Sequence, residues 1–374
     1  MTKRKILFLI PNLGGGGAER VFLHLLNNLD RLKFDFHLCV LRQEGPFFSE
    51  LSSDVTVINL NTSLRRSLFK VADTIRNLHP DVVLSNVCFM NLITGFARMY
   101  LPNQIPLYLA RESGIPSQRK LLYKNKFLRY IELLYRLSYR LFDGIICQSD
   151  DMLFDVHKMY GVPQRKLIKI NNPVDIDHIQ RLANDIVATK FLPDKTNLLA
   201  VGRLNQQKGF DLLLQAMALT KNKRLHLHIL GEGDEYGKLR SHAEELRLSD
   251  RVTFHGFCKN PYAYMAAADV FVMTSRYEGF PNAMVEAMAL GCPTVAFQCQ
   301  GGLNEIIKNC MNGYSVEFGN IREFAMLLDK GDYLNLDRKL IVKDIWNRYR
   351  LDKIVKEYEY ILTNVCKKDC RETG

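Results

Sequence analysis

The strongest constraint on the fold is a series of short apolar runs that recur along the chain. The runs are rich in Val, Ile and Leu and mostly lack polar alternation, as is typical of parallel strands covered on both faces. Each interval has room for a helix, so the sequence predicts repeated strand–helix units and an open parallel α/β sheet. The first predicted strands are 5–10, 36–41, 55–60, 81–87, 105–110, 144–148 and 167–170.

The same pattern restarts after a break near residue 173. A polar stretch runs to Thr196, and further strands are predicted at 198–201, 225–230, 252–254, 270–273, 294–297 and 314–318. A length of 374 residues also suits about two domains. We therefore expect two Rossmann-like domains, residues 1–172 and 173–345, facing each other across a cleft. Residues 346–374 are predicted to form a C-terminal helix that packs on its own domain or returns to the first.

Composition excludes several classes of protein and places the net charge in the first half. No apolar run approaches the ~18 residues of a membrane-spanning helix. Nine Cys, an odd number without a CxxC pair, are typical of reduced thiols in a cytosolic protein. Residues 1–172 hold 24 Lys and Arg against 14 Asp and Glu, whereas the remainder holds 27 against 26. We expect the first domain to face an anionic surface or polymer, and the neutral second half argues against a nucleic-acid partner.

Two loops of the second half carry the predicted ligand-binding residues. Gly202-Arg203-Leu204 follows a strand, and Lys208-Gly209 stands near the start of a helix, so two cations and helix amides suit a diphosphate. Glu278-Gly279-Phe280-Pro281-Asn282 leads into a helix with Glu286 about one turn inside. These carboxylates suit the hydroxyls of a ribose and a hexose. Taken singly, each charge could equally be a solvated surface residue, but two Glu around a Gly-Phe-Pro turn favour a site.

Several short segments, taken in order over residues 5–320, carry a family resemblance. Glu278 and Glu286 have the E-x7-E spacing of the retaining, GT-B-fold, nucleotide-sugar-dependent glycosyltransferases of family 4, and the chain resembles that family. The matching segments are Gly14-Gly15-Gly16-Gly17-Ala18-Glu19-Arg20, Asn171-Asn172-Pro173-Val174-Asp175, Gly202-Arg203-Leu204 with Lys208-Gly209, Leu230-Gly231-Glu232-Gly233, Phe254-His255-Gly256-Phe257, Glu278-Gly279-Phe280-Pro281-Asn282 and Gly301-Gly302-Leu303-Asn304-Glu305-Ile306.

The resemblance implies roles for these residues. Arg203 and Lys208 would bind the diphosphate of a UDP-sugar and stabilise the leaving nucleotide, while Glu278 would hold the transferred sugar and Glu286 the ribose. Arg203, Lys208 and Glu278 are the predicted catalytic residues. The wider donor site would comprise Gly15 and Gly16 from the first domain, the backbone at Phe257, and Gly279, Phe280, Pro281 and Asn282. The family is regarded as using front-face displacement with retention, in which the departing phosphate helps deprotonate the acceptor, so no metal or other cofactor is expected.

Two features depart from the family pattern or compete with it. Many members carry a His in the first-domain loop near Arg111 and Glu112, and this chain has none there. Arg111 or Glu112 is therefore a candidate contact to the sugar or the acceptor. Asp175-Ile176-Asp177 spells D-x-D, the metal motif of a different transferase fold, but its place at the predicted domain junction favours a linker.

The basic first domain also predicts contact with a membrane. Residues 118–141 combine many cations with interleaved aromatic and aliphatic residues, as is typical of a helix on an anionic bilayer. The alternative is that the apolar face packs on the sheet and the cations are merely solvated. The resemblance adds support, because many relatives glycosylate polyprenyl-diphosphate-linked acceptors on the cytoplasmic leaflet. The cations proposed for this contact are Arg119, Lys120, Lys124, Lys126 and Arg129.

The sequence thus predicts a cytoplasmic glycosyltransferase, peripheral on the inner face of the cell membrane. It would move a hexose or N-acetylhexosamine from a UDP-sugar to a lipid-linked or polysaccharide acceptor in surface glycan biosynthesis, with retention. One alternative is a nucleotide-sugar epimerase on the same fold, which would need an acid–base pair that the sequence does not offer convincingly. Another is a non-catalytic basic adaptor on a membrane surface.

Overall fold

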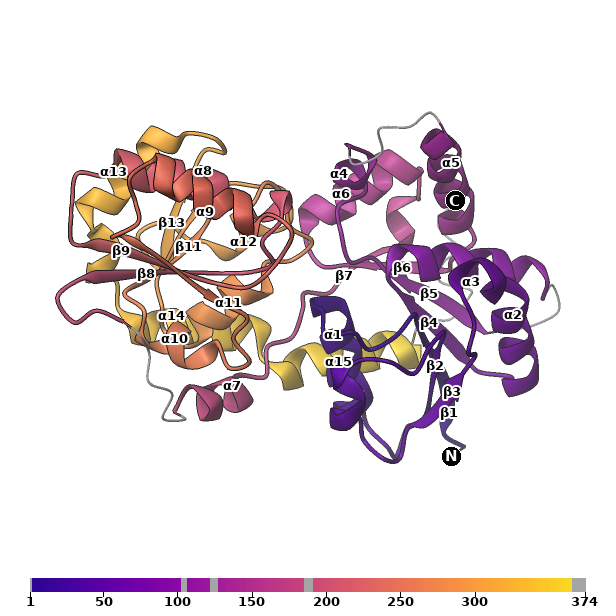
Figure 1. The fold of residues 1–374 in the computed structure, drawn as a ribbon. Coiled ribbons are helices and arrows are strands. Elements are labelled where there is room, and N and C mark those ends of the chain that lie inside the picture. The colour runs from indigo at the N-terminus through magenta and orange to yellow at the C-terminus, as the bar shows by residue number, and fades with distance from the viewer. Residues whose placement is uncertain (1, 102–105, 122–126, 185–190, 365–374) are drawn as a thin grey trace. The chain divides into compact units, whose positions relative to one another are not determined.

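A computed structural model describes residues 2–101, 106–121, 127–184 and 191–364, with side chains described outside 119–130. The chain divides into two compact units (Figure 1). Unit 1 comprises Met1–Pro173 and the segment that begins at Leu351, and unit 2 comprises Val174–Arg350. Unit 2 therefore extends beyond the predicted boundary at residue 345, because its last helix continues to Tyr349.

Unit 1 is built on a parallel sheet of seven strands in the order β3-β2-β1-β4-β5-β6-β7. Its strands are β1 (Arg4–Ile10), β2 (Phe34–Val40), β3 (Thr56–Asn59), β4 (Val82–Asn86), β5 (Leu107–Arg111), β6 (Gly144–Cys147) and β7 (Leu167–Lys169). Its α-helices are α1 (Gly17–Asn28), α2 (Ser67–Leu78), α3 (Cys88–Met99), α4 (Pro116–Leu121), α5 (Phe127–Arg140), α6 (Asp150–Tyr160) and α15 (Leu351–Asn364), with 3-10 turns η1 (Pro46–Glu50), η2 (Leu64–Arg66) and η3 (Gln164–Lys166).

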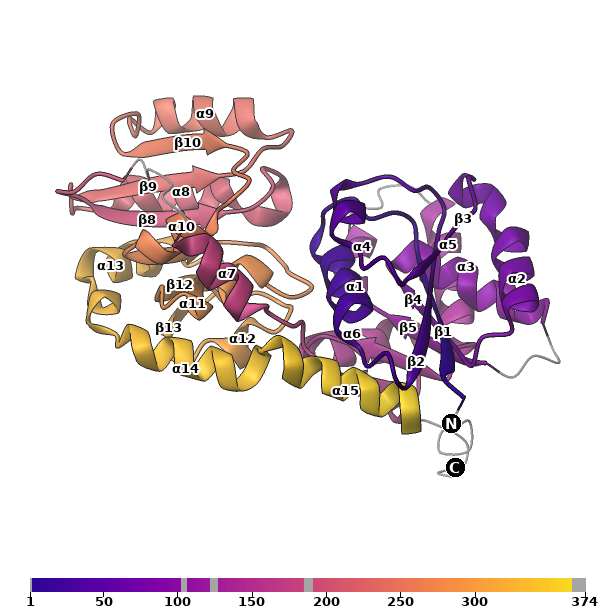
Figure 2. The same cartoon turned by 90° about the horizontal axis from the view of Figure 1, so that it is seen from below.

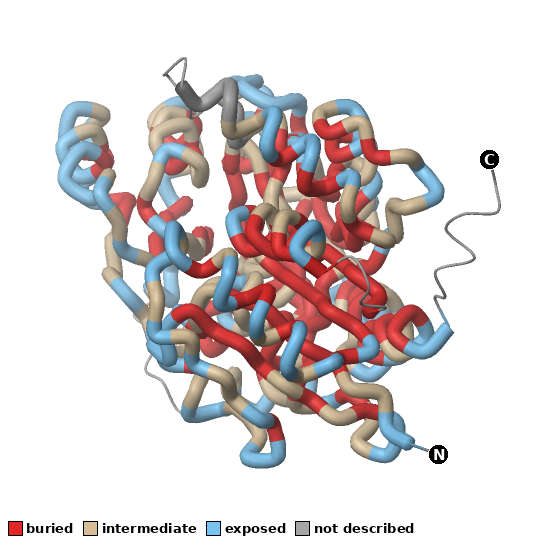
Figure 3. Tube along the Cα trace, turned by 90° about the vertical axis from the view of Figure 1, so that its right-hand side faces the viewer, coloured by how far each residue is buried: buried red, intermediate tan, exposed pale blue. Residues whose placement is uncertain are grey.

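Alternate residues of the β1 strand enter two different hydrophobic cores. Ile6 and Phe8 pack in a core that includes residues of α1 and α15. Leu7 and Leu9 pack in a second core with residues of α2, α3, α5 and α6. Because successive side chains of a strand point to opposite faces, helices cover both faces of the sheet. The inner strands β4, β5 and β6 are wholly buried, whereas the edge strands β3 and β7 are partly exposed. Figure 3 shows buried segments that run through the molecule.

Unit 2 repeats the plan with a parallel sheet of six strands in the order β10-β9-β8-β11-β12-β13 (Figure 2). Its strands are β8 (Thr196–Val201), β9 (Leu225–Leu230), β10 (Val252–Gly256), β11 (Val270–Met273), β12 (Thr294–Phe297) and β13 (Gly313–Val316). Its α-helices are α7 (Ile176–Ala183), α8 (Phe210–Leu219), α9 (Tyr236–Glu245), α10 (Tyr262–Ala267), α11 (Asn282–Ala289), α12 (Leu303–Ile306), α13 (Ile321–Lys330) and α14 (Arg338–Tyr349), with 3-10 turns η4 (Gln206–Lys208) and η5 (Asp332–Asn335).

The predicted parallel α/β sheets are confirmed, and every predicted strand is present within a few residues of its expected bounds. Ser149 caps α6 as its sequence suggests: its side chain accepts a hydrogen bond from the Met152 N–H, and Gly161 ends the helix at φ +64°. The helix expected near Lys208 begins two residues later, at Phe210. In the region of the helix expected over 118–141 the structure describes α4 and α5, and residues 122–126 lie outside the described residues.

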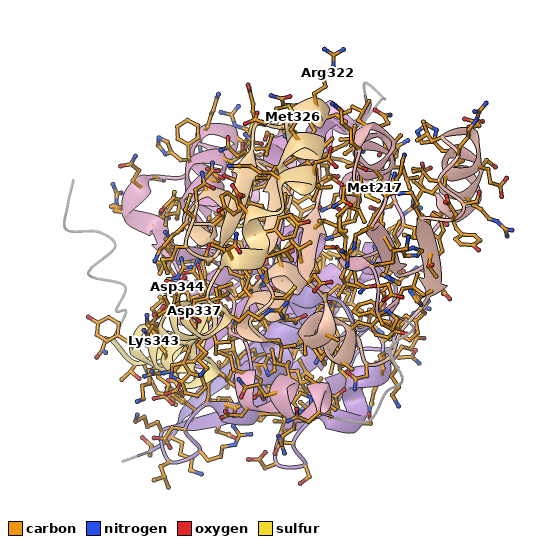
Figure 4. The ribbon with its side chains drawn as sticks, turned by 90° about the vertical axis from the view of Figure 1, so that its left-hand side faces the viewer. Met217, Arg322, Met326, Asp337, Lys343 and Asp344 are labelled. Atoms are coloured by element: carbon orange, nitrogen blue, oxygen red, sulfur yellow. The ribbon has the colours of Figure 1, made fainter. Side chains whose placement is uncertain are left out.

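The α14 helix is fixed in unit 2 by a cap and by a buried carboxylate, both labelled in Figure 4. Asp337 accepts hydrogen bonds from the first backbone amides of the helix. Asp344 pairs with Lys308 at 2.7 Å and with Arg348, and accepts a hydrogen bond from Asn312 at 3.1 Å. Asp344 therefore ties the helix to the segment between α12 and β13.

Three histidines stack on neighbouring strands of unit 2. The rings of His226 and His228 lie 4.7 Å apart on β9, and His228 stacks on His255 of β10 at 5.2 Å. His228 Nδ1 lies 2.9 Å from His255 Nε2, and its Nε2 lies 3.1 Å from Asn197 Oδ1. Burial, together with the two neighbouring imidazoles, lowers the pKa of His228 to about 3. His228, at the centre of this array, is therefore neutral near pH 7.

We predict that this array makes unit 2 less stable in mild acid. Because folding depresses the pKa of His228, the unfolded chain binds a proton that the folded chain does not, and stability falls as the pH drops below about 6.5. One such group can change the free energy of unfolding by at most about 1.4 kcal/mol per pH unit. Urea unfolding followed by the fluorescence of Trp346, which is the chain's single Trp and lies on α14, measures this slope between pH 7.5 and 5.

His228→Gln should reduce the pH dependence of the free energy of unfolding. His242→Gln should leave it unchanged, because His242 lies on α9 with its side chain partly exposed. Equal slopes for wild type and His228→Gln would contradict the prediction.

Candidate active site

Glycine contacts hold the carboxyl ends of β8, β9 and β10 together in unit 2. The Gly202 N–H donates to the Leu230 carbonyl at 3.0 Å, and the Gly231 N–H donates to the Gly256 carbonyl at 2.8 Å. Gly231 has φ +143°, and a Cβ there would lie 1.9 Å from the Gly202 carbonyl oxygen. A side chain is thus excluded at this position. The contact fixes the start of the loop on which Arg203 is exposed.

The turn that carries Lys208 packs directly on the loop after β11. Asn205 Oδ1 accepts a hydrogen bond from the Lys208 N–H at 3.2 Å and so caps η4. Gly209 follows at φ +64°, where a Cβ would lie 2.0 Å from the Thr274 carbonyl oxygen. The Thr274 hydroxyl in turn donates to the Gly209 carbonyl at 2.8 Å. Gly209 also explains why the helix starts later than predicted, since its left-handed conformation separates η4 from α8.

A bidentate ion pair joins the first turn of α8 to the loop after β11. Arg276 donates from its two terminal nitrogens to the Asp211 carboxylate at 2.8 and 2.7 Å. Its backbone N–H donates to the Gln207 carbonyl at 2.8 Å, and the Gln207 amide donates to the Tyr277 carbonyl at 3.0 Å. This pair was not predicted, because nothing in the local sequence links residues 65 positions apart.

Lys208 and Glu278, both predicted site residues, are in contact where the turn of Lys208 meets the loop after β11. Lys208 Nζ lies 2.7 Å from Glu278 Oε1, and the Ser275 hydroxyl donates to the same oxygen at 2.6 Å. Glu278 is only 5% exposed. These three side chains and Pro281 line one small cavity at the ends of β8 and β11. The arrangement holds an ammonium, whose remaining protons can meet an anion, beside a carboxylate that can accept from a hydroxyl.

The backbone of Glu278 is held from behind by Gly301. The Glu278 N–H donates to the Gln300 carbonyl at 2.9 Å. Gly301 has φ +120°, and a Cβ there would lie 1.9 Å from the Glu278 carbonyl oxygen. The Gly301-Gly302 pair was visible in the sequence, but its spacing gave no sign that it supports Glu278.

The loop after Glu278 delivers the start of α11. Pro281 precedes the first helical residue, Asn282, and Glu286 lies half-buried one turn inside. The ring of Phe280 is buried and packs edge-to-face on Tyr349 at 5.7 Å, so this side chain anchors the loop. Gly279 is partly exposed beside it. The helix thus presents its positive end close to the small cavity.

Phe257, which was expected to border a base, follows β10 with its side chain 71% exposed. Its backbone N–H donates to Glu232 Oε1 at 3.3 Å. The Glu232 carbonyl in turn accepts from the Leu204 N–H at 2.8 Å. The loop after β9, which carries Glu232, therefore contacts both the loop of Phe257 and the loop of Arg203.

In unit 1, the predicted Gly15 and Gly16 form the turn between β1 and α1. Gly15 has φ +92°, and Gly16 is the N-cap of α1. The loop after β2 supports this turn: the Leu13 N–H donates to the Glu44 carbonyl at 3.1 Å, and a Cβ on Gly45 would lie 2.0 Å from the Leu13 carbonyl oxygen. The turn is therefore fixed by a second loop packed against it.

Arg111 and Glu112 correct an expectation, because both are fully buried in unit 1. The Arg111 guanidinium donates to Tyr358 Oη at 3.2 Å, to Asn86 Oδ1 at 3.1 Å and to Asn172 Oδ1. It thereby ties the sheet to α15 and to the end of the unit's first segment. The Glu112 carboxylate accepts hydrogen bonds from the two following backbone amides and from the Tyr139 hydroxyl. Both groups are used internally, so we do not retain them as substrate contacts.

The proposed membrane cations cannot be placed by their side chains. Lys124 and Lys126 lie outside the described residues, and the structure describes the side chains of neither Arg119, Lys120 nor Arg129. In the described part of α5, two tyrosines pack in the core, whereas three leucines are exposed. The exposed residues are Leu133, Leu134 and Leu137.

Two negative findings hold for the part of the chain that the structure describes. No helix there is both long enough and apolar enough to cross a membrane. The His, Cys, Asp and Glu side chains in the same ranges do not gather in threes as a metal site would need. Asp175 of the D-x-D sequence caps α7, where it accepts a hydrogen bond from the His178 N–H at 3.1 Å.

Comparison with known proteins decides the family. The profile for glycosyl transferases group 1 matches residues 184–331, and that for glycosyltransferase family 4 matches residues 15–178. An N-acetylgalactosamine-N,N'-diacetylbacillosaminyl-diphospho-undecaprenol 4-alpha-N-acetylgalactosaminyltransferase of Campylobacter jejuni is 32% identical over 328 residues, covering 85% of this chain and 87% of that protein. The chain belongs to the group 1 glycosyltransferases.

Other relatives of this glycosyltransferase agree with that assignment. The amylovoran biosynthesis glycosyltransferase AmsD of Erwinia amylovora is 25% identical over 365 residues, covering 96% of this chain and 99% of that protein. The crystal structure of Anabaena HepE in complex with UDP superposes with a TM-score of 0.80 at 20% identity, covering 96% of this chain and 100% of the other. The predicted GT-B fold class is thus confirmed.

Replacing Gly301 by alanine should disturb Glu278 and, with it, turnover. The Cβ would strike the Glu278 carbonyl, and φ is in the region that disfavours side chains, so we expect a loss of about 2 kcal/mol or more in stability. Sugar transfer should fall at least tenfold in the fraction that remains folded. Urea unfolding and initial rates measure the two effects.

Gly237→Ala provides the matched control. Gly237 lies in α9, and a Cβ there would meet nothing within 4 Å. Alanine should stabilise that helix by about 0.5–1 kcal/mol and leave turnover intact. A Gly301→Ala enzyme as stable and active as Gly237→Ala would refute the supporting role of Gly301.

Proposed function

We propose that this glycosyltransferase moves a hexose or N-acetylhexosamine from a UDP-sugar to a lipid-linked or polysaccharide acceptor, with retention at the anomeric carbon. The observation that carries the proposal is the contact between Lys208 and Glu278 beside the start of α11. The relatives support it, since one is named for transfer to a diphospho-undecaprenol-linked glycan and HepE was crystallised with UDP.

Positive charge for the leaving nucleotide comes from three sources in unit 2. Lys208 keeps ammonium protons available besides the one that it donates to Glu278, Arg203 is exposed on the adjacent loop, and α11 presents its positive end. When the bond between the anomeric carbon and the β-phosphate oxygen breaks, negative charge develops on that oxygen. Fixed positive charges aimed at this oxygen stabilise the transition state. The proposal thus needs no metal or other cofactor.

The remaining proposed roles come from the family resemblance. Glu278 accepts hydrogen bonds from hydroxyls of the transferred sugar, and Glu286 accepts them from the ribose. Phe257 borders the base, and Gly15 and Gly16 bring backbone amides to the β-phosphate. As the acceptor oxygen bonds to the anomeric carbon on the face that the nucleotide leaves, its proton passes to the departing phosphate oxygen. The configuration of the anomeric carbon is therefore retained.

We expect Glu278→Gln to lower turnover by about 100-fold or more, because the charge that orients Lys208 and accepts from the sugar is lost. Glu244→Gln is the control, since Glu244 lies on α9 with an exposed side chain. Nucleotide release from a panel of UDP- and GDP-sugars measures turnover, and circular dichroism checks the fold.

Thermal shift with the same panel tests the donor separately. A bound nucleotide sugar raises the melting temperature by mass action. The proposal expects a UDP-sugar to raise that of the wild type and a smaller rise for Lys208→Met. No rise with any sugar nucleotide would contradict the proposed function and favour a non-catalytic adaptor. Full turnover by Glu278→Gln would contradict the role proposed for Glu278.

Unit 1 is proposed to rest peripherally on the cytoplasmic face of the membrane. Leu133, Leu134 and Leu137 are exposed on α5, with Arg136 and Arg140 exposed on the same helix. Exposed leucines beside cations suit the boundary of an anionic bilayer. Leu134→Glu should reduce co-sedimentation with phosphatidylglycerol vesicles, whereas Leu32→Glu, at another exposed leucine of unit 1, should not. Equal sedimentation of the two variants would oppose this placement.

A further inference from the structure

A second polar depression lies in unit 1, away from the residues assigned above. It is formed at the carboxyl ends of β2 and β3 and at the start of α2. We call it the basic pocket, and its principal lining residues are Arg42, Asn59, Asn61, Thr62, Arg66 and Lys70. Open parallel sheets commonly bind ligands at the carboxyl edge of their strands.

The cations of the basic pocket have donors to spare. Within the described ranges, the Arg66 guanidinium makes no side-chain hydrogen bond or ion pair, and it is exposed. Arg42 meets Glu44 at 3.8 Å with both side chains more than half exposed, which is a weak pairing. Lys70 donates to the Leu60 carbonyl at 2.9 Å and retains further protons. Three cations against the single carboxylate of Glu44 leave the lining positive.

The loop after β3, which lines the basic pocket, is held by hydrogen bonds that two of its backbone amides donate. The Asn61 N–H donates to Asn59 Oδ1 at 3.0 Å, and the Thr62 N–H donates to the Leu41 carbonyl at 3.0 Å. Asn61 adopts the left-handed conformation at φ 41°. The lining amide and hydroxyl side chains are suited to sugar hydroxyls, whereas the three cations are suited to a phosphate. A single-charged carboxylate would leave part of that positive charge unmatched.

One wall of the basic pocket is the loop that supports the glycine turn after β1. The Arg42 N–H donates to the Pro11 carbonyl at 3.2 Å, and the Glu44 carbonyl accepts from Leu13. Gly45 closes the contact, since its missing Cβ would strike Leu13. A ligand in the pocket therefore contacts the same loop that packs against the turn of Gly15.

We propose that the basic pocket binds a phosphate or diphosphate group of the acceptor, an inference that rests on the proposed transfer to a glycan acceptor. The phosphate belongs to a lipid-diphosphate carrier or to a phosphorylated sugar of the growing chain. Arg66 and Lys70 contact its oxygens, and Arg42 closes the pocket from the neighbouring loop. No bond is made or broken in the pocket, which positions the acceptor only.

Calorimetric titration of inorganic pyrophosphate into the full chain tests the pocket directly. UDP is kept saturating, because pyrophosphate is also expected at Lys208 in unit 2. Arg66→Gln and Lys70→Gln should each weaken pyrophosphate binding about tenfold or more, since each removes a charge-assisted contact. Arg65→Gln is the matched control, because Arg65 is an exposed cation of the same η2 turn that does not line the pocket.

Two results would overturn the proposal: no pyrophosphate binding to the UDP-saturated wild type, or the same loss in Arg65→Gln as in Arg66→Gln. UDP titrated alone keeps the two proposals separate, because its affinity should be unchanged in Arg66→Gln. If UDP itself fails to bind, the proposed function fails, and pyrophosphate titrated into Lys208→Met still tests the pocket.

A vesicle arm identifies the source of the phosphate. Phosphatidylcholine vesicles that carry a polyprenyl diphosphate should compete with pyrophosphate in the wild type if the source is a lipid carrier. If only glucose 1-phosphate competes, the site is retained and the source is a phosphorylated sugar. Competition by plain phosphatidylglycerol vesicles that is equal for Arg65→Gln and Arg66→Gln would contradict a specific site.

Discussion

The contact between Lys208 and Glu278 is the interaction on which the account of unit 2 depends. Taking a carboxylate and an ammonium out of water costs several kcal/mol per ion, and their attraction often no more than offsets it. Such a pair therefore contributes little net free energy to folding. Here Glu278 is buried and shares one oxygen with Ser275 and Lys208. The pair is more easily understood as a charge arrangement that is kept ready for a ligand.

Two glycine contacts make this arrangement possible. Gly209 and Gly301 each bring a backbone against another at a distance that no side chain would permit. One contact seats the turn of Lys208 on the loop after β11, and the other seats Glu278 from behind. The ion pair between Arg276 and Asp211 then joins the first turn of α8 to the loop after β11. The positions of Lys208 and Glu278 are thus set by backbone packing and by the ion pair of Arg276 and Asp211, which lies outside the cavity.

The sequence predicted the parts of the structure that local pattern controls. Buried parallel strands are short and continuously apolar, so their positions were visible, and the Ser149 and Gly161 caps were visible because capping is local. Contacts between residues that lie far apart in the sequence were not visible in it. Nothing near Arg111 indicates that Asn172 and Tyr358 meet its guanidinium, so an internal structural residue was mistaken for a substrate contact. Ser275 and Arg276 were missed for the same reason.

The most direct test of the central claim compares how tightly UDP and UMP bind to wild type and to Lys208→Met. The two nucleotides differ by the β-phosphate, so their affinity ratio isolates the contribution of the charges near that group. We expect the wild type to bind UDP about tenfold or more tightly than UMP. This preference should largely disappear in Lys208→Met, while the affinity for UMP changes little. A variant that retains the full preference for UDP would show that Lys208 does not bind the diphosphate.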